Sequence, residues 1–214
     1  MNDKKIFGLK QEIMRLKKLS ENQEKEIEKL KSFADYDFLT GLYNRQGFLR
    51  EAERFVDLLK DSEKFFNRGR ERRKFAISNF SIIFIDLDNL KKVNDKYSHK
   101  AGDKYIKLCA DVFKKTLRDI DIIGRWGGDE FVVGLIDTNI NEAEKVAKKL
   151  KTALSRAKIK GLPGIKPSAS FGVIAAKNQQ GKIIADMSKL LEKSDKAMYQ
   201  AKKKEGKGQI IIFK

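Results

Sequence analysis

The stretch Gly124-Arg125-Trp126-Gly127-Gly128-Asp129-Glu130-Phe131 lies between two apolar runs and decides how this chain of 214 residues is organised. The runs 121–123 and 131–135 predict two strands joined by a two-residue turn, Gly127-Gly128. A Gly-Gly turn suits a primed hairpin, because both of its central residues need a positive φ. Glycines also let a ligand approach the backbone, and two carboxylates follow directly. The stretch therefore indicates either a site for a metal ion and a phosphate chain or an ordinary hairpin whose acids face solvent.

The composition restricts the partners and the compartment. The formal net charge of +17 favours an anionic partner such as a nucleic acid, a membrane surface or a nucleotide. Cys109 is the only cysteine and lies within a helical pattern, which excludes a disulfide framework and a thiolate metal site and fits a reducing cytoplasm. No apolar run approaches the roughly 20 residues of a membrane span, and the N-terminus has no signal-peptide core. We therefore expect a soluble, cytoplasmic protein without a membrane span.

Residues 1–34 carry a heptad pattern. Its seam positions alternate at spacings of three and four and are surrounded by charged residues: Ile6, Leu9, Ile13, Leu16, Ser20, Gln23, Ile27, Leu30 and Ala34. The pattern predicts a coiled-coil helix that joins two copies of the chain, although the polar Ser20 and Gln23 weaken the seam locally. The alternative is a single amphipathic helix that lies on its own domain. In the first case the coil brings together two copies of a domain formed by residues 35–214.

A second helical segment begins after a break in this periodicity. Gly41 supplies a turn and Asn44 a helix N-cap, and the helix that follows is expected to bury Phe48, Ala52, Phe55, Val56 and Leu59. The run 64–74 is strongly basic, with Glu71 as its only acid. It predicts a solvated loop or, alternatively, a contact with an anionic partner.

The rest of the chain alternates β-rich runs with helical patterns. Phe80–Ile85 predicts a buried strand that ends in Asp86-Leu87-Asp88, and a polar turn follows over residues 94–103. Next come a helix over 106–117, the hairpin, a helix over 143–154, a strand over 168–174, a helix over 187–201 and a strand over 209–213. This order predicts an α+β protein with a ferredoxin-like or palm βαββαβ core, in which helices pack on one face of an antiparallel sheet.

In such a sheet the first strand and the hairpin can be neighbours, so Asp86 and Asp129 can converge on one site. Two carboxylates, a turn nearly free of side chains and flanking lysines suit Mg²⁺ bound to a triphosphate, because Mg²⁺ prefers few carboxylates together with phosphate oxygens and water. The chain has no Gly-rich Walker loop and a single histidine, which argues against a P-loop enzyme and a zinc hydrolase. That histidine, His99, can satisfy a local backbone group or contact a ligand.

The stretch from about Asp35 to Phe213 resembles the GGDEF family of diguanylate cyclases, whose pentapeptide stands here as Gly127–Phe131. Four further blocks match in the same order: Asp37-x-Leu39-Thr40-Gly41-Leu42-x-Asn44-Arg45, Asp86-x-Asp88 with Lys91-x-x-Asn94-Asp95, His99-x-x-Gly102-Asp103, and Ala197-Met198-Tyr199-x-Ala201-Lys202. The resemblance implies condensation of two GTP into cyclic di-GMP with release of two pyrophosphates. Each of two domains would hold one GTP, and the 3′-hydroxyl of each would attack the α-phosphate of the other.

The resemblance also assigns roles to single residues. Asp86, the Leu87 carbonyl and Asp129 become Mg²⁺ ligands, with Mn²⁺ as a substitute, and Glu130 becomes a ligand of a second ion. Asp129 and Glu130 are the implied catalytic acids, and which of them, if either, takes the hydroxyl proton stays open. The implied GTP-binding residues are Asn89, Leu90, Lys91, Asn94, His99, Asp103, Gly127, Gly128, Lys202 and Lys207. Within this set, Asn94 and Asp103 match the guanine-reading positions, and Lys91 and Lys202 face the β- and γ-phosphates.

The chain departs from the family pattern at two places. One extra residue separates the Ala-Lys pair from Gly206-Lys207, so Lys203 or Lys204 could replace Lys207 as the phosphate ligand. Ser98 stands where the family usually has glycine, which would reshape the turn before His99.

Arg118 and Asp121 match the RxxD inhibitory motif at the usual five-residue distance from the pentapeptide. An arginine can bind guanine and phosphate, and an aspartate can accept from a base edge, so feedback by the product is physically reasonable. The first hypothesis is therefore a GTP-condensing homodimer. The alternatives are a catalytically weak cyclic di-GMP receptor and, from charge alone, a nucleic-acid-binding coiled coil, for which no specific reader motif is present. No sensor domain precedes the coil in this sequence.

Overall fold

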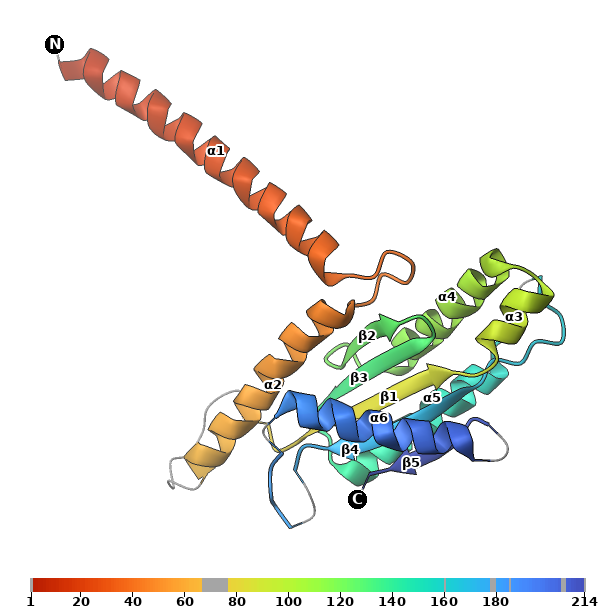
Figure 1. The fold of residues 1–214 in the computed structure, drawn as a ribbon. Coiled ribbons are helices and arrows are strands. Elements are labelled where there is room, and N and C mark those ends of the chain that lie inside the picture. Colours follow the sequence, from red (N-terminus) through yellow and green to blue (C-terminus); the bar gives the residue numbers. More distant parts are fainter. Residues whose placement is uncertain are drawn as a thin grey trace.

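The computed structural model describes residues 2–66, 77–159, 161–177, 180–184, 186–204 and 207–213. The part of the basic run 64–74 from residue 67 onward lies outside these ranges, so both of its interpretations stay predictions. The elements are α1 (Asn2–Asp35), α2 (Arg45–Phe66), β1 (Phe80–Leu87), α3 (Leu90–Lys96), α4 (His99–Thr116), β2 (Ile122–Gly127), β3 (Glu130–Ile136), α5 (Ile140–Arg156), β4 (Ala169–Ala175), α6 (Met187–Lys203) and β5 (Ile210–Ile212). Figure 1 shows α1 projecting from a domain built around one sheet.

The five strands form a sheet with the order β2-β3-β1-β4-β5. β1 lies in the middle and pairs antiparallel with β3 and β4, while β2 and β3 form the predicted hairpin. This arrangement is the predicted βαββαβ core, and the palm-like fold is confirmed. The short β5 adds a parallel pair with β4, so the sheet is not wholly antiparallel.

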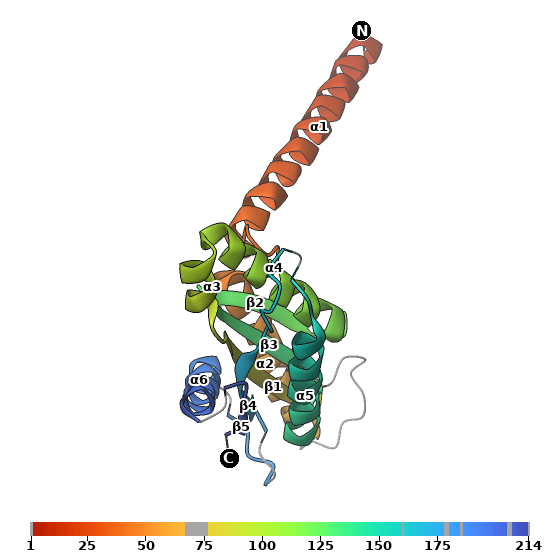
Figure 2. The same ribbon diagram turned by 90° about the vertical axis from the view of Figure 1, so that its right-hand side faces the viewer.

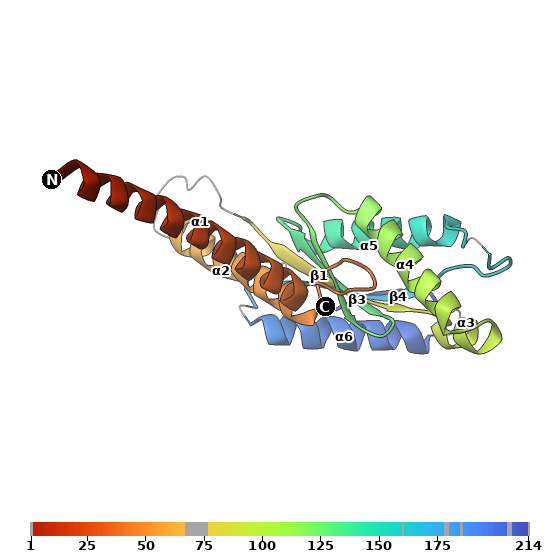
Figure 3. The same ribbon diagram turned by 90° about the horizontal axis from the view of Figure 1, so that it is seen from above.

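Helices cover both faces of the sheet, whereas the sequence predicted helices on one face (Figures 2 and 3). α4 and α5 pack on the face that carries Ile83 and Ile85, and α2 and α6 pack on the face that carries Ile82 and Phe84. Every residue of β1 is consequently buried. The one-face prediction was wrong because it did not use the continuous apolar run 80–85, which is typical of a strand covered on both sides.

The polar segment after β1 forms helices instead of the predicted turn. α3 begins directly after Asn89, whose φ of 66° is left-handed, and α4 begins after Ser98, whose hydroxyl accepts from the Ala101 N–H at 3.3 Å. Val93 is the only buried residue of α3. A helix of seven residues with a single buried apolar position leaves no periodicity in the sequence, which explains why it was missed.

The N-terminal helix α1 stands apart from the sheet and leaves its heptad seam uncovered (Figure 1). The large apolar seam residues whose side chains the structure describes are between 45% exposed, at Ile6, and 57% exposed, at Leu9. The alternative of a helix lying on its own domain was therefore wrong. In the part of the chain that the structure describes, no helix is both long and apolar enough to cross a membrane.

The start of α2 is capped as predicted. The Asn44 side chain accepts from the Gly47 N–H at 3.0 Å and, with its amide group, donates to the Ala34 carbonyl at 2.7 Å. The same residue therefore begins α2 and ties it to the last turn of α1. Arg50 of α2 also forms an ion pair with Asp35 at the end of α1. The joint between the long helix and the domain is thus held by several bonds.

Candidate active site

The pairing of β1 with β3 brings the predicted acidic residues together. Asp86 lies opposite Glu130 in the strand register, and the Leu87 N–H donates to the Asp129 carbonyl at 3.0 Å. Lys202 reaches the same place from α6, and its Nζ donates to Asp86 Oδ2 at 2.7 Å. The first strand and the hairpin are thus neighbours, as predicted, and their acidic residues lie close together.

The hairpin turn lies one residue later than predicted. β2 ends at Gly127, which pairs with Glu130, so the two turn residues are Gly128 and Asp129. Gly128 has a φ of 46°, whereas Gly127 and Asp129 do not have positive φ values. Only the first turn residue needs glycine, as in a type II′ turn. A bulge between Arg125 and Gly127 shifts the register by one residue and so places Asp129 at the tip.

Burial shapes the electrostatics of this cluster. Asp86 is 4% exposed, and burial raises its pKa above the ordinary carboxyl value, against the lowering effect of the Lys202 bond. Burial also raises the pKa of Glu130, and the negative charges of Asp86, Asp129 and Asp195 raise it further. Burial has the largest single effect on Lys202 and lowers its pKa, but the bond to Asp86 and the charges of Asp86, Asp129 and Asp88 together raise the pKa above its ordinary value. The cluster therefore carries excess negative charge that a cation stabilises.

The donor set fits a divalent cation that also binds phosphate. Asp86 Oδ1 is buried and has no hydrogen-bond partner among the described residues, so one carboxylate oxygen is left for another ligand. Within the described ranges, no three His, Cys, Asp or Glu side chains are grouped closely enough to hold a metal ion by themselves. Mg²⁺ usually takes one or two carboxylates and completes its shell with phosphate oxygens and water. The cluster thus suits an ion that arrives with a nucleotide.

The predicted guanine-reading residues lie next to one another on α3 and α4. Asn94 projects from α3 onto Gly102, where an added Cβ atom would clash with Asn94 Oδ1. That oxygen is buried and has no partner among the described residues, while the adjacent Asp103 is exposed. Lys91 and His99 are exposed on the same two helices. A buried amide oxygen without a partner among the described residues, beside an exposed carboxylate, suits a ligand that presents several N–H groups.

Lys207 reaches the loop after β1 in spite of the extra residue before it. Its Nζ donates to Asn89 Oδ1 at 2.9 Å, which places the ammonium group beside the first residues of α3. Lys203 lies over the Tyr199 ring, with its Nζ 4.4 Å from the ring centroid. Lys207 therefore lies at the loop between β1 and α3, where the phosphate-binding residue is expected, whereas Lys203 packs on Tyr199.

Two polar residues near the cluster were missed as functional candidates. Asp88, which is 1% exposed, accepts hydrogen bonds from the Ser168 and Ser170 hydroxyls at 2.7 and 3.2 Å and so ties β1 to β4. Arg125 joins the Gly128 carbonyl to Asp37. The sequence signal for Asp88 lay in the matched block Asp86-x-Asp88. Arg125 has no local signal, because its partner Asp37 is 88 residues away.

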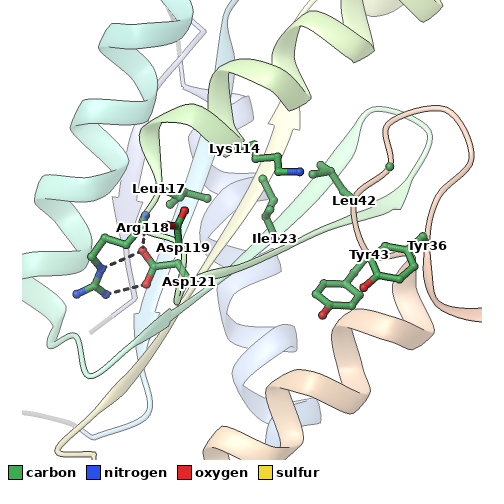
Figure 4. Close-up of a pocket in the computed structure, with 10 residues that line it drawn as sticks. Tyr36, Leu42, Tyr43, Lys114, Leu117, Arg118, Asp119, Asp121 and Ile123 are labelled. Carbon is green, nitrogen blue, oxygen red and sulfur yellow. Dashed lines mark hydrogen bonds and ion pairs between the residues drawn. The ribbon is translucent and has the colours of Figure 1, made fainter. Parts of the chain in front are cut away.

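The RxxD residues Arg118 and Asp121 border a separate pocket of about 220 Å³ (Figure 4). Arg118 donates from Nη2 to Asp121 Oδ1 at 2.7 Å, and also to the Ile136 carbonyl and the Thr138 hydroxyl. The bond to Asp121 raises the pKa of Arg118. The opposite wall carries Tyr36 and Tyr43, whose stacked rings have centroids 4.9 Å apart. The lining of the pocket thus includes the Arg118 guanidinium, which is hydrogen-bonded to the Asp121 carboxylate, and two aromatic side chains.

Comparison with known proteins gives consistent matches over this fold. Residues 34–208 match the family model described as "Diguanylate cyclase, GGDEF domain". The chain is 28% identical over 184 residues to the diguanylate cyclase DgcM of Escherichia coli and 34% identical over 169 residues to the diguanylate cyclase DgcS of Shewanella oneidensis. These matches cover 86% and 79% of this chain, but only 40% and 50% of those two proteins.

Solved structures show the same fold. The coiled coil and GGDEF domain of DgcB from Caulobacter crescentus, crystallised with c-di-GMP, superposes with a TM-score of 0.74 at 20% identity and covers 95% of this chain and 98% of that chain. The GGDEF domain of TpbB, also called YfiN, from Pseudomonas aeruginosa gives a TM-score of 0.66 at 28% identity, with coverage of 84% and 94%. The first of these likenesses extends over nearly the whole chain, including the N-terminal helix.

Proposed function

Because the chain belongs to the GGDEF family of diguanylate cyclases, we propose that it condenses two molecules of GTP into cyclic di-GMP and releases two pyrophosphates. The observation that carries the proposal is the buried Asp86 carboxylate, which lies opposite Glu130 and beside the Asp129 turn. One of its oxygens binds Lys202, and the other has no partner among the described residues. A carboxylate with only one of its oxygens hydrogen-bonded supports a site where a metal ion can replace the Lys202 ammonium group.

The GTP molecule is proposed to lie between α3, α4 and the hairpin. Guanine would be bound by the unpartnered Asn94 oxygen and by Asp103, because a carboxylate can accept from guanine N1–H and N2–H₂. The triphosphate would be bound by basic and backbone groups around the same loop and turn, namely Asn89, Leu90, Lys91, His99, Gly127, Gly128, Lys202 and Lys207. Lys202 would then exchange its bond to Asp86 for a bond to phosphate.

Asp86, the Leu87 carbonyl and Asp129 are proposed as the ligands of one divalent ion, and Glu130 as a ligand of a second. When bound, Mg²⁺, or Mn²⁺ in its place, supplies charge neutralisation on the phosphates and a lower pKa for the attacking 3′-hydroxyl. The Asp129 and Glu130 carboxylates lie at the turn, where this hydroxyl would be held. The chain's own contribution is thus to orient two phosphate-bearing partners and to hold the negative charge that binds the ions.

The active form is proposed to be a homodimer joined through α1. The product needs two GTP molecules, and one domain offers one set of the residues assigned above. The exposed seam from Ile6 to Ile27 supports a parallel coil that raises the local concentration of the second domain. Light scattering on the wild type and on Ile13→Asp checks this. A monomeric wild type would contradict it.

Feedback by cyclic di-GMP is proposed at the pocket of Arg118 and Asp121. The guanidinium can bind phosphate or a guanine edge, and the Tyr36–Tyr43 stack offers an aromatic wall for a base. We place the reaction in the cytoplasm, where the buried free thiol of Cys109 stays reduced.

The decisive experiment is incubation of the protein with GTP and Mg²⁺, with the product identified by mass. Formation of cyclic di-GMP supports the cyclase. If GTP is not consumed while cyclic di-GMP still binds the protein, the chain is a receptor that uses the Arg118 pocket. If neither nucleotide binds and duplex DNA binds with a steep salt dependence, the chain is a nucleic-acid-binding protein whose partner is selected by its positive charge.

A further inference from the structure

Arg125 spans the space between the loop that follows α1 and the turn that carries Asp129. From its place on β2, its Nε and Nη2 donate to the Gly128 carbonyl at 3.0 and 2.8 Å. Its Nη1 donates to Asp37 Oδ1 and Oδ2 at 3.3 and 3.2 Å. The side chains of Arg125 and Asp37 are each 14% exposed. One guanidinium thus uses both of its edges on two segments that are far apart in sequence.

The Asp37 end of this bridge belongs to a tightly bonded loop. Asp37 Oδ1 also accepts from the Thr40 N–H at 2.9 Å and from its hydroxyl at 2.7 Å. The Asn44 N–H donates to the Asp35 carbonyl at 2.7 Å, so the loop returns to the last residue of α1. The position of Asp37 is therefore fixed relative to the end of the long helix.

The Gly128 end belongs to the catalytic turn. Gly128 is the first residue of this turn, and its carbonyl accepts hydrogen bonds from Nε and Nη2 of Arg125. The next residue is Asp129, whose own carbonyl accepts from the Leu87 N–H at 3.0 Å. The turn is thus held from two sides, by Arg125 on one and by β1 on the other.

We propose that Arg125 is a positioning residue that sets the place of the Asp129 turn, and that Asp37 sets the place of Arg125. The geometry of the joint below α1 is thereby coupled to the geometry of the catalytic turn. The importance of this turn for activity rests on the function proposed above. The bridge needs the planar fork of arginine, because a lysine ammonium at the same place cannot hold the carboxylate and the carbonyl with two separate edges.

The test compares Arg125→Gln, Arg125→Lys and Asp37→Asn with the wild type. Each is expected to lower kcat by about 10- to 100-fold, the range for a displaced catalytic group, while KM for GTP changes less, because the proposed guanine-binding residues are on α3 and α4. Arg125→Lys keeps the positive charge but is expected to have the same low kcat as Arg125→Gln. The reporter that does not depend on turnover is the Leu87 amide, whose hydrogen exchange should become faster in all three variants.

A double variant shows whether Asp37 acts through Arg125 or whether the two residues affect the turn independently. The double variant Asp37→Asn with Arg125→Gln should exchange at Leu87 no faster than Arg125→Gln alone. The matched control is Arg54→Gln, because the Arg54 side chain is 71% exposed and pairs with Glu51 of its own helix. It should leave kcat and Leu87 exchange unchanged.

Unchanged Leu87 exchange in Asp37→Asn and Arg125→Gln would overturn the proposal, and so would full restoration of kcat by Arg125→Lys. If the Arg125 variants do not fold, Asp37→Asn alone decides, because its amide oxygen can still accept from Thr40 and the loop can keep its shape. A wild type that makes no cyclic di-GMP would end the proposed function. The exchange at Leu87 would still decide whether Arg125 holds the turn.

Discussion

Asp121, which directly precedes β2, and Asp86 of β1 bind a basic side chain in different ways. Asp121 is bonded through both oxygens: Oδ2 accepts from the Arg118 N–H and Nε, and Oδ1 accepts from Arg118 Nη2 and the Ile136 N–H. Asp86 accepts one bond, from Lys202, and its other oxygen has no partner in the described part of the chain. The two side chains are similarly buried, at 2% and 5% exposure. The difference therefore lies in how far each carboxylate is satisfied.

A satisfied buried carboxylate stabilises the fold, whereas a half-satisfied one retains the capacity to bind something else. Asp121 holds the end of α4 against β3, and its bonds are part of the tertiary structure. The buried Asp86 carboxylate has one cationic partner, Lys202, and this partner is weakly held because its side chain is 44% exposed. Stability and binding capacity are thus assigned to two different aspartates, Asp121 just before β2 and Asp86 on β1.

The largest effect is expected from removing the charge at the half-satisfied site. Asp86→Asn should lower cyclic di-GMP synthesis by about 1,000-fold, because a metal-binding carboxylate contributes several kcal/mol to the transition state. The melting temperature should not fall, because the neutral amide avoids the burial of a charge and water can solvate Lys202. Product formation measured by mass and thermal unfolding check the two parts.

The control for this variant is Asp111→Asn, which removes the same charge from an exposed position on α4. It should leave both activity and melting temperature as they are. An Asp86→Asn protein that keeps its activity would remove Asp86 from the proposed metal site.

The opposite result is expected at the satisfied site. Asp121→Asn should lower the free energy of unfolding by about 1–3 kcal/mol, because it weakens the charge-assisted bonds to Arg118 and the bond to the Ile136 N–H. Initial rates of synthesis should stay near those of the wild type, while inhibition by added product should weaken. Urea unfolding and rates measured with and without cyclic di-GMP test this. Unaltered feedback in a folded variant would separate Asp121 from the inhibitory role.

A third variant extends the comparison to the residues proposed to bind guanine. Gly102→Ala places a Cβ where Asn94 Oδ1 now lies, so this side chain must move away from its present position. We expect KM for GTP to rise about 10-fold, the equivalent of one lost hydrogen bond, while the helix itself gains propensity from alanine. Steady-state kinetics with GTP provide the measurement. An unchanged KM would show that Asn94 does not need this position.

The smallest effect concerns pH. The pKa values of Asp86 and Glu130 are raised by burial, so each binds its proton at a higher pH than in the unfolded chain. A divalent ion needs the charged form, and its stabilising effect should therefore grow as pH rises and disappear as pH falls through these raised values. The shift in melting temperature on adding Mn²⁺, measured from pH 5 to pH 8, tests the sign. A shift that grows toward low pH would contradict it.

Much of the site was predictable because its residues stand in local blocks. The run 80–85 followed by Asp86 predicted a strand that ends in a ligand, and the glycines before Asp129 predicted a hairpin. The same local rules misplaced the turn by one residue, because a bulge between Arg125 and Gly127 depends on the pairing of two strands. They also missed α3, whose one buried residue, Val93, gives no period.

The sequence by itself determined the order of the strands and of the helices other than α3, the heptad seam of α1 and the chemical groups available to the site. These follow from periodicity, turn residues and spacing, which act within about one element of the chain. Only the tertiary structure decided that helices cover both faces, that Asp86 lies opposite Glu130 and that Lys202 occupies one of its two oxygens. It also decided that Arg125 reaches Asp37 across 88 residues. The reason is that the choice of neighbouring strands and the side-chain contacts between distant segments depend on how the elements pack, which the periodicity of a single element does not specify.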